Sequence, residues 1–186
     1  GKRFLPGSII YVNAHKFIKY GPRDRIYHVL FQPGERLSCE NYVVTKNFLV
    51  LCLMENCMTR LEFHKLEKDG NKFRLVGTES AGQIRTMNIR AVDPHVGDEF
   101  WMTTSGYAEP TTLWLCDAMK MDTQDKKSVR KSGPEEFIKR RLKAMPEQFD
   151  HKDVEVVQNT CKSKDGTEIP YFLIRKASLP SDKPAP

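Results

Sequence analysis

The chain has 186 residues, of which 39% are hydrophobic and 29% charged, and its formal net charge at pH 7 is +6. This balance is typical of a folded globular protein and excludes disorder along the whole chain. The longest apolar run, 48–54, is far shorter than the roughly 20 residues of a membrane helix, so we expect no membrane span. The positive excess gathers between Lys120 and Lys143. Without an aromatic platform or a binding module beside it, this charge does not predict nucleic-acid binding.

The first residues, 1–7, carry neither an initiator Met nor the apolar core of a signal peptide, so we expect the chain to begin inside a longer protein. The cysteines are odd in number and none of their spacings is that of a metal site. They predict reduced, mostly buried thiols in a cytoplasmic protein, with a reactive thiol or a disulfide as the alternatives. The cysteines concerned are Cys39, Cys52, Cys57, Cys116 and Cys161.

Short runs of β-branched and aromatic residues, separated by turn residues, fill most of the chain and predict an all-β protein. A sandwich, a barrel and a propeller all show this pattern. In chain order, the expected strands lie at 8–13, 25–31, 39–45, 47–54, 59–65, 72–76, 86–92, 99–104 and 111–116.

The spacing of these strands favours a β-propeller, whose period is roughly 40 residues for four strands. Residues 39–76 hold four strands joined by tight turns, which amounts to one blade. Residues 86–116 supply three strands of a second blade, and the two runs before residue 31 are interpreted as the outer half of a preceding one. The fold class predicted is therefore a partial propeller of two to three blades. Periodicity alone leaves a β-sandwich open.

The segment 120–143 is polar, charged and poor in strand formers. Ser132, an early Pro134 and the acidic pair Glu135-Glu136 resemble the start of a helix, so we expect a short helix at 134–143. Its basic residues lie toward the carboxyl end, where they complement the helix dipole. A solvated basic helix is favoured over a binding patch.

A hairpin is expected after residue 146, with strands at 154–162 and 168–175. They are joined by Ser-Lys-Asp-Gly-Thr at 163–167, in which Asp-Gly is a strong hairpin signal. The proline-rich end, 177–186, is expected to be flexible. The predicted organisation is a partial propeller over 1–145, a linker and hairpin over 146–176, and then this tail.

The sequence contains residue types that act in catalysis, but not in the spacing that catalysis requires. No G-x-S-x-G motif is present, and the nearest match, 77–82 with Ser80, is predicted to be a loop between blades. Glu135 and Glu136 point in different directions on a helix and make a poor acid–base pair. The histidines are scattered singly, without zinc spacing: His15, His28, His64, His95 and His151. We therefore assign no catalytic, cofactor-binding or metal-binding residue.

Several segments, taken in order, resemble the late propeller blades and the start of the peptidase domain in the prolyl oligopeptidase family. The matches begin near 7–11 and 45–51. They continue through Ala-Val-Asp-Pro at 91–94 and Glu-Pro-Thr-Thr-Leu-Trp at 109–114. The most specific match is Pro-Glu-Gln-Phe-Asp at 146–150 followed by the hairpin turn. Together they cover about residues 1–175, with an apparent insertion within 121–138 and a departure at 178–186.

The resemblance implies a non-catalytic propeller segment of a serine peptidase that hydrolyses short peptides, in which the propeller restricts substrate access. The family's Ser, Asp and His would lie downstream of residue 186, so none is carried over to this chain. It implies short peptide substrates, the remaining propeller and a peptidase domain as partners, with no cofactor, nucleic acid or membrane. The alternative is a propeller that only binds protein partners.

Overall fold

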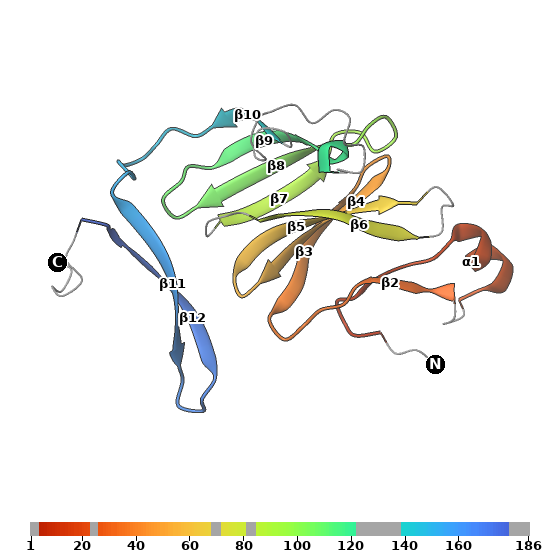
Figure 1. Cartoon of the computed structure of the whole chain (residues 1–186), viewed down its shortest axis with the longest axis horizontal. Helices are drawn as coiled ribbons and strands as arrows, with labels where there is room; N and C mark the ends of the chain where they lie inside the picture. Colours follow the sequence, from red (N-terminus) through yellow and green to blue (C-terminus); the bar gives the residue numbers. More distant parts are fainter. Residues whose placement is uncertain (1–3, 23–25, 68–71, 81–84, 122–138, 179–186) are drawn as a thin grey trace.

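The computed structural model describes residues 4–22, 26–67, 72–80, 85–121 and 139–178. The described residues form two four-stranded and two two-stranded antiparallel sheets (Figure 1). The predicted all-β class and the partial propeller are confirmed. Among these residues no helix is long and apolar enough to cross a membrane.

The first four-stranded sheet is the expected first blade. Its strands are β3 (Leu37–Val44), β4 (Phe48–Glu55), β5 (Met58–Leu66) and β6 (Phe73–Ser80), paired in sequence order as an antiparallel meander. Strand β4 is buried on both faces along its apolar run. This explains why the run is continuous rather than alternating, because a strand covered on both sides needs apolar residues at every position.

The second four-stranded sheet has β7 (Arg85–Ala91) at one edge, followed by β8 (Glu99–Gly106), β9 (Thr112–Asp117) and β10 (Lys139–Ala144) at the other. A short 3-10 helix, η2 (Ala118–Met121), follows β9. The second blade therefore has a fourth strand in addition to the three expected, and the chain reaches it after the segment 122–138.

The expectation of a helix at 134–143 is wrong for its second half, since 139–143 belong to β10. The first half lies outside the described residues. Strand β10 pairs with β9 from Lys139↔Cys116 to Ala144↔Thr112, with an irregularity between Arg141 and Lys143. Pairing with the free edge of β9 outweighs the local helix signals, because tertiary contacts commonly override helix propensity. The charged residues suit an edge strand, where they discourage pairing with other chains.

The loop expected at 77–82 is also corrected, because β6 continues to Ser80 and pairs Gly77 with Phe63. Residues 81–82 lie outside the described residues. The sequence pattern did not predict helix α1 (Ala14–Tyr20), which lies between β1 (Ile9–Tyr11) and β2 (His28–Phe31). These two strands pair with each other, as the outer half of a preceding blade would.

The main core lies between the two blades. Six buried residues come from the first blade: Val43, Phe48, Val50, Cys52, Leu61 and Phe63. Six come from the second blade and η2: Ile89, Phe100, Met102, Cys116, Ala118 and Met121. A second cluster on the other face of β4 joins Leu49, Leu51 and Leu53 to Phe31 of β2. Each face of the first blade is thus packed against a neighbouring sheet, as in a propeller.

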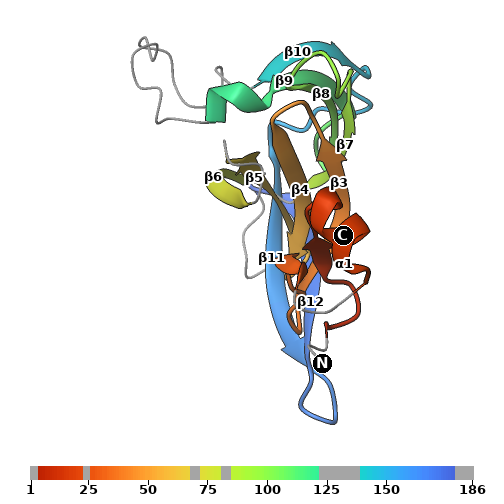
Figure 2. The ribbon, with the colours of Figure 1, turned by 90° about the vertical axis from the view of Figure 1, so that its right-hand side faces the viewer.

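Strands β11 (Val154–Lys162) and β12 (Glu168–Lys176) form the expected hairpin. Hydrogen bonds from the Ser163 side chain and the Thr167 backbone to Asp165 stabilise its turn, and they lower the pKa of Asp165 to about 2. Gly166 has a φ of 85°, which favours glycine. Figure 1 shows the hairpin beside the blades as a separate ribbon, and in Figure 2 its turn extends beyond them. Of the tail expected to be flexible, 179–186 lie outside the described residues, whereas Ser178 is hydrogen-bonded to Asp153.

Candidate functional site

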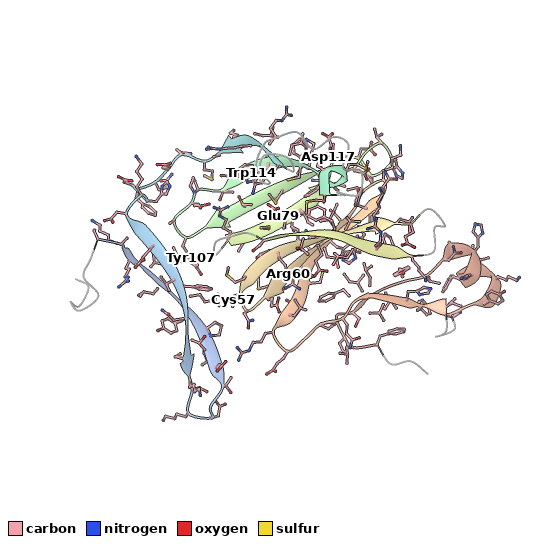
Figure 3. The ribbon with its side chains drawn as sticks, in the orientation of Figure 1. Cys57, Arg60, Glu79, Tyr107, Trp114 and Asp117 are labelled. Atoms are coloured by element: carbon pink, nitrogen blue, oxygen red, sulfur yellow. The ribbon has the colours of Figure 1, made fainter. Side chains whose placement is uncertain are left out.

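A cleft lies between the hairpin and one end of the blades. The turns at this end contribute Arg36, Asn56 and Tyr107, each of which contacts the hairpin. Figure 3 shows Tyr107 and Cys57 at this end, on the side of β11 and β12. This end is therefore the part of the blades that meets the next unit of the chain.

Among the described residues, contacts of three kinds join the two sides of the cleft. The ring of Tyr107 lies 5.4 Å from the ring of Phe172, at a tilt of 44°. The Gln158 side-chain amide donates to the Asn56 carbonyl at 2.6 Å. An ion pair joins Arg36 and Glu168 at 3.3 Å, and both side chains are more than two-fifths exposed. Such an exposed pair is worth at most about 1 kcal/mol.

Between these contacts the cleft is open. One cavity of about 800 Å³ is lined by Met58 and Tyr107 on the blade side and by Val154 and Val156 on the hairpin side. A second cavity, of about 460 Å³, includes Cys57 in its lining. Apolar walls with a few polar groups are common in binding clefts.

An ion pair between Arg85 and Glu109 lies in the wall of the larger cavity. Both side chains are about one-fifth to one-third exposed. Arg85 begins β7 and Glu109 lies in the connection from β8 to β9, so the pair joins two parts of the second blade. The charges of Arg85 and Glu109 are therefore paired with each other within the second blade.

Ser80 does not lie in a nucleophile elbow. It is the last residue of β6, where its backbone is paired with Arg60 of β5 in a regular antiparallel ladder. A nucleophilic serine in an α/β-hydrolase instead lies on a strained turn from a strand to a helix. The local geometry at Ser80 therefore differs from the one that activates such a serine.

The histidines lie in separate parts of the fold. His64 is 8% exposed and is 3.2 Å from Glu62, which also pairs with Arg60. Burial lowers the pKa of His64, against the opposing effect of Glu62, so its ring is neutral at pH 7. Arg60, Glu62 and His64 all lie on β5, so these interactions join side chains within the first blade. Among the described residues no group of three His, Cys, Asp or Glu side chains could hold a metal ion.

The remaining histidines have other surroundings. His15 lies on α1, His95 lies in the connection between β7 and β8, and His28 is stacked on Tyr11 at 5.1 Å. His151 is 3.7 Å from Glu147 in the connection before the hairpin. The described histidines thus lie in separate parts of the fold.

The cysteines are all free thiols, and Cys39 is half-buried. The expectation that they are mostly buried is wrong, because two are buried and two are exposed. Cys52 and Cys116 are buried between the blades, and this burial raises the pKa of each to about 12. Cys57, in the lining of the smaller cavity, and Cys161, on β11, are exposed. Because the thiolate is the reactive form, the two buried thiols are inert near neutral pH.

Two successive four-stranded blades, packed face to face and followed by a separate hairpin, define a segment of a β-propeller protein. No model of a protein family matches the sequence. The chain is 28% identical to an uncharacterized peptidase of Sinorhizobium fredii over 155 residues, which are 83% of this chain and 18% of that protein.

Solved structures extend this similarity to the fold. A post-proline cleaving enzyme from Rickettsia typhi matches with a TM-score of 0.65 and 17% identity over 94% of this chain and 22% of that one. Oligopeptidase B from Trypanosoma brucei, with covalently bound antipain, matches with a TM-score of 0.61 and 19% identity over 85% of this chain and 21% of that one. The resemblance to the prolyl oligopeptidase family is thus confirmed. The chain spans about a fifth of the length of these relatives.

Proposed function

We propose that this chain is a non-catalytic segment of a prolyl-oligopeptidase-like serine peptidase, in which the blades restrict the access of short peptides and the hairpin opens the peptidase domain. The observation that carries the proposal is the succession of two four-stranded blades and a separate hairpin, in a chain similar in fold to a post-proline cleaving enzyme over 94% of its length and to oligopeptidase B over 85%. We place the boundary between the two domains near residue 146 and the whole enzyme in the cytoplasm.

The surface of the hairpin supports a second domain. Val157, Ile169, Tyr171 and Leu173 lie on one face of the hairpin, according to the register of the two strands, and each is 37–47% exposed. An apolar face of a two-stranded sheet needs a partner, because two strands alone are only marginally stable in water. Further strands of a hydrolase sheet would extend the edges of the hairpin, and helices packed on that sheet would cover this face.

The proposal predicts that a fluorophosphonate probe labels no serine of this chain, because such probes react with activated nucleophiles and Ser80 lies in a regular strand. Intact mass spectrometry after incubation with the probe measures this, with an active serine peptidase as the positive control. Stoichiometric labelling of Ser80 would contradict the assignment of the chain as non-catalytic.

The reading frame of the gene beyond the codon for Pro186 tests the peptidase assignment itself. We expect it to encode G-x-S-x-G and then a later Asp and His, in the chain order of an α/β-hydrolase. A gene that continues instead with further blades, and has no such motif, would contradict the proposal and favour a propeller that only binds protein partners.

A further inference from the structure

We infer that the outer edge of β10 binds an extended acidic segment of a partner protein, which pairs with β10 as a fifth strand of the second blade. This edge lies away from the hairpin cleft, and the inference does not rest on the peptidase proposal. Three features of β10 support it: a free backbone edge, a positive charge that its surroundings do not neutralise, and a contrast with the last strand of the first blade.

Strand β10 is an edge strand of its sheet. It pairs with β9 on one side, and no strand of the described residues pairs with its other side. Along such an edge, alternate backbone N–H and C=O groups point away from the sheet and can pair with another strand. Figure 1 shows β10 on the outer side of the second blade, whereas β7 lies next to the first blade. Neighbouring blades pack on the faces of a blade, so further blades would not pair with this edge.

The residues of β10 carry more positive charge than the residues around them neutralise. The strand has six residues, and the basic ones are Lys139, Arg140, Arg141 and Lys143. Lys139 forms an ion pair with Glu79 of β6 at 3.5 Å, and its ammonium group lies 5.3 Å from the centre of the Trp114 ring. Within the part of the chain that the structure describes, the other three basic side chains form no ion pair, and all three residues are exposed.

These basic side chains lie on both faces of the strand. According to the pairing with β9, Arg141 lies on the same face as Trp114, whereas Arg140 lies on the opposite face with Leu115. Lys143 also lies on that opposite face, because the register shifts after Arg141. Successive residues of an added strand alternate between the two faces in the same way. Acidic residues of the partner can therefore meet basic side chains on both faces, and each such cross-strand pair is favourable.

Strand β6 ends the first blade as β10 ends the second, but it has no excess of charge. Its charged residues are Arg74 and Glu79, which have opposite signs. The positive charge of β10 is thus not a shared feature of the last strands of the two blades. Basic residues on an edge strand discourage pairing with neutral or basic segments, and the same charges attract an acidic one. They therefore make the edge of β10 selective for a segment of opposite charge.

Fluorescence anisotropy with defined peptides tests this inference on the whole chain. The probe is a short labelled peptide of alternating Glu and Val. A second peptide alternates Lys and Val, and a third has the sequence of the probe but is N-methylated at its backbone amides, so it keeps the charge and loses the strand hydrogen bonds. We expect the chain to bind the probe, more weakly at high salt, and to bind neither of the other two peptides. Failure to bind the probe, or equally tight binding of the N-methylated peptide, would overturn strand addition.

Two double variants with the same change in charge locate the site. Arg140→Gln with Arg141→Gln should weaken the affinity for the probe by roughly two- to thirtyfold, the range for two cross-strand charge pairs. Lys16→Gln with Lys19→Gln is the matched control, because it removes two exposed charges from α1, and it should leave the affinity unchanged. In the unsubstituted chain the probe should also slow hydrogen exchange in β10 and not in β6. Equal losses of affinity in the two variants, or unchanged exchange in β10, would contradict the assignment of the site to this edge.

Discussion

Replacing Phe63 with Ala is expected to destabilise the chain by about 3–5 kcal/mol, among the largest effects of any single substitution, because it opens a cavity in a core that cannot collapse around it. Phe63 is fully buried at the interface of the two blades, where its ring lies 6.1 Å from that of Phe100. Globular domains have a total stability of roughly 5–15 kcal/mol. The urea concentration at the midpoint of unfolding should therefore fall by a large fraction.

Substitutions of Phe63 and Phe100 also test whether the two blades unfold together. The double variant Phe63→Ala, Phe100→Ala should be less destabilised than the sum of the single variants, by about 0.5–1.5 kcal/mol. Phe149→Ala is the control, because Phe149 is 54% exposed and should change stability by no more than about 0.5 kcal/mol. Two separate transitions, one for each blade, would contradict a shared core.

The second large effect is expected for Asp98→Ala, which should reduce the free energy of unfolding by about 2–4 kcal/mol. Asp98 lies before β8 in the second blade and is 7% exposed. Its carboxylate accepts from the Thr45 hydroxyl at 2.8 Å and from the Asn47 backbone and side-chain amides at 2.7 Å each, all in the turn between β3 and β4 of the first blade. The substitution removes the acceptor that these three donors share, beside the buried Thr45 and the exposed Asn47.

Two comparisons isolate the role of the carboxylate. Asp98→Asn should recover part of the stability, because one oxygen remains as an acceptor while the new amide group faces a donor. Asp93→Ala should reduce the free energy of unfolding by about 1 kcal/mol or less. Asp93 is exposed, and its carboxylate accepts a hydrogen bond from the backbone N–H of His95 at 2.9 Å. Equal losses for Asp93→Ala and Asp98→Ala in urea unfolding would show that Asp98 does not join the blades.

Apolar runs and the alternation of apolar and polar residues predict most strands of the two blades, with β10 as the exception. In the second blade, for example, Phe100 and Met102 face the core and Trp101 lies on the other side. The hairpin was predictable in detail because its turn sequence favours a single geometry. Local sequence carries both features, which explains why the blades and the hairpin are found where they were expected.

Features that depend on tertiary contacts were not predictable in this way. Strand β10 has the composition of a solvated helix and becomes a strand because β9 offers it a free edge. Asp98 is 51 residues from Asn47 in the sequence, so no local pattern indicates their contact. The same holds for Tyr107 and Phe172, which meet across the cleft. The seven-residue helix α1 is too short to show a clear helical period.

Native-state hydrogen exchange tests most directly the central claim that the two blades form one unit and the hairpin begins another. The slowest amides should lie in β4 and β5, which are paired on both sides within the first blade and carry much of the shared core. Amides of β11 and β12 should exchange faster, because the hairpin is a two-stranded sheet held by few contacts. If β11 and β12 instead proved the slowest-exchanging segment of the chain, the hairpin would be part of the core, and a domain boundary near Pro146 would be wrong.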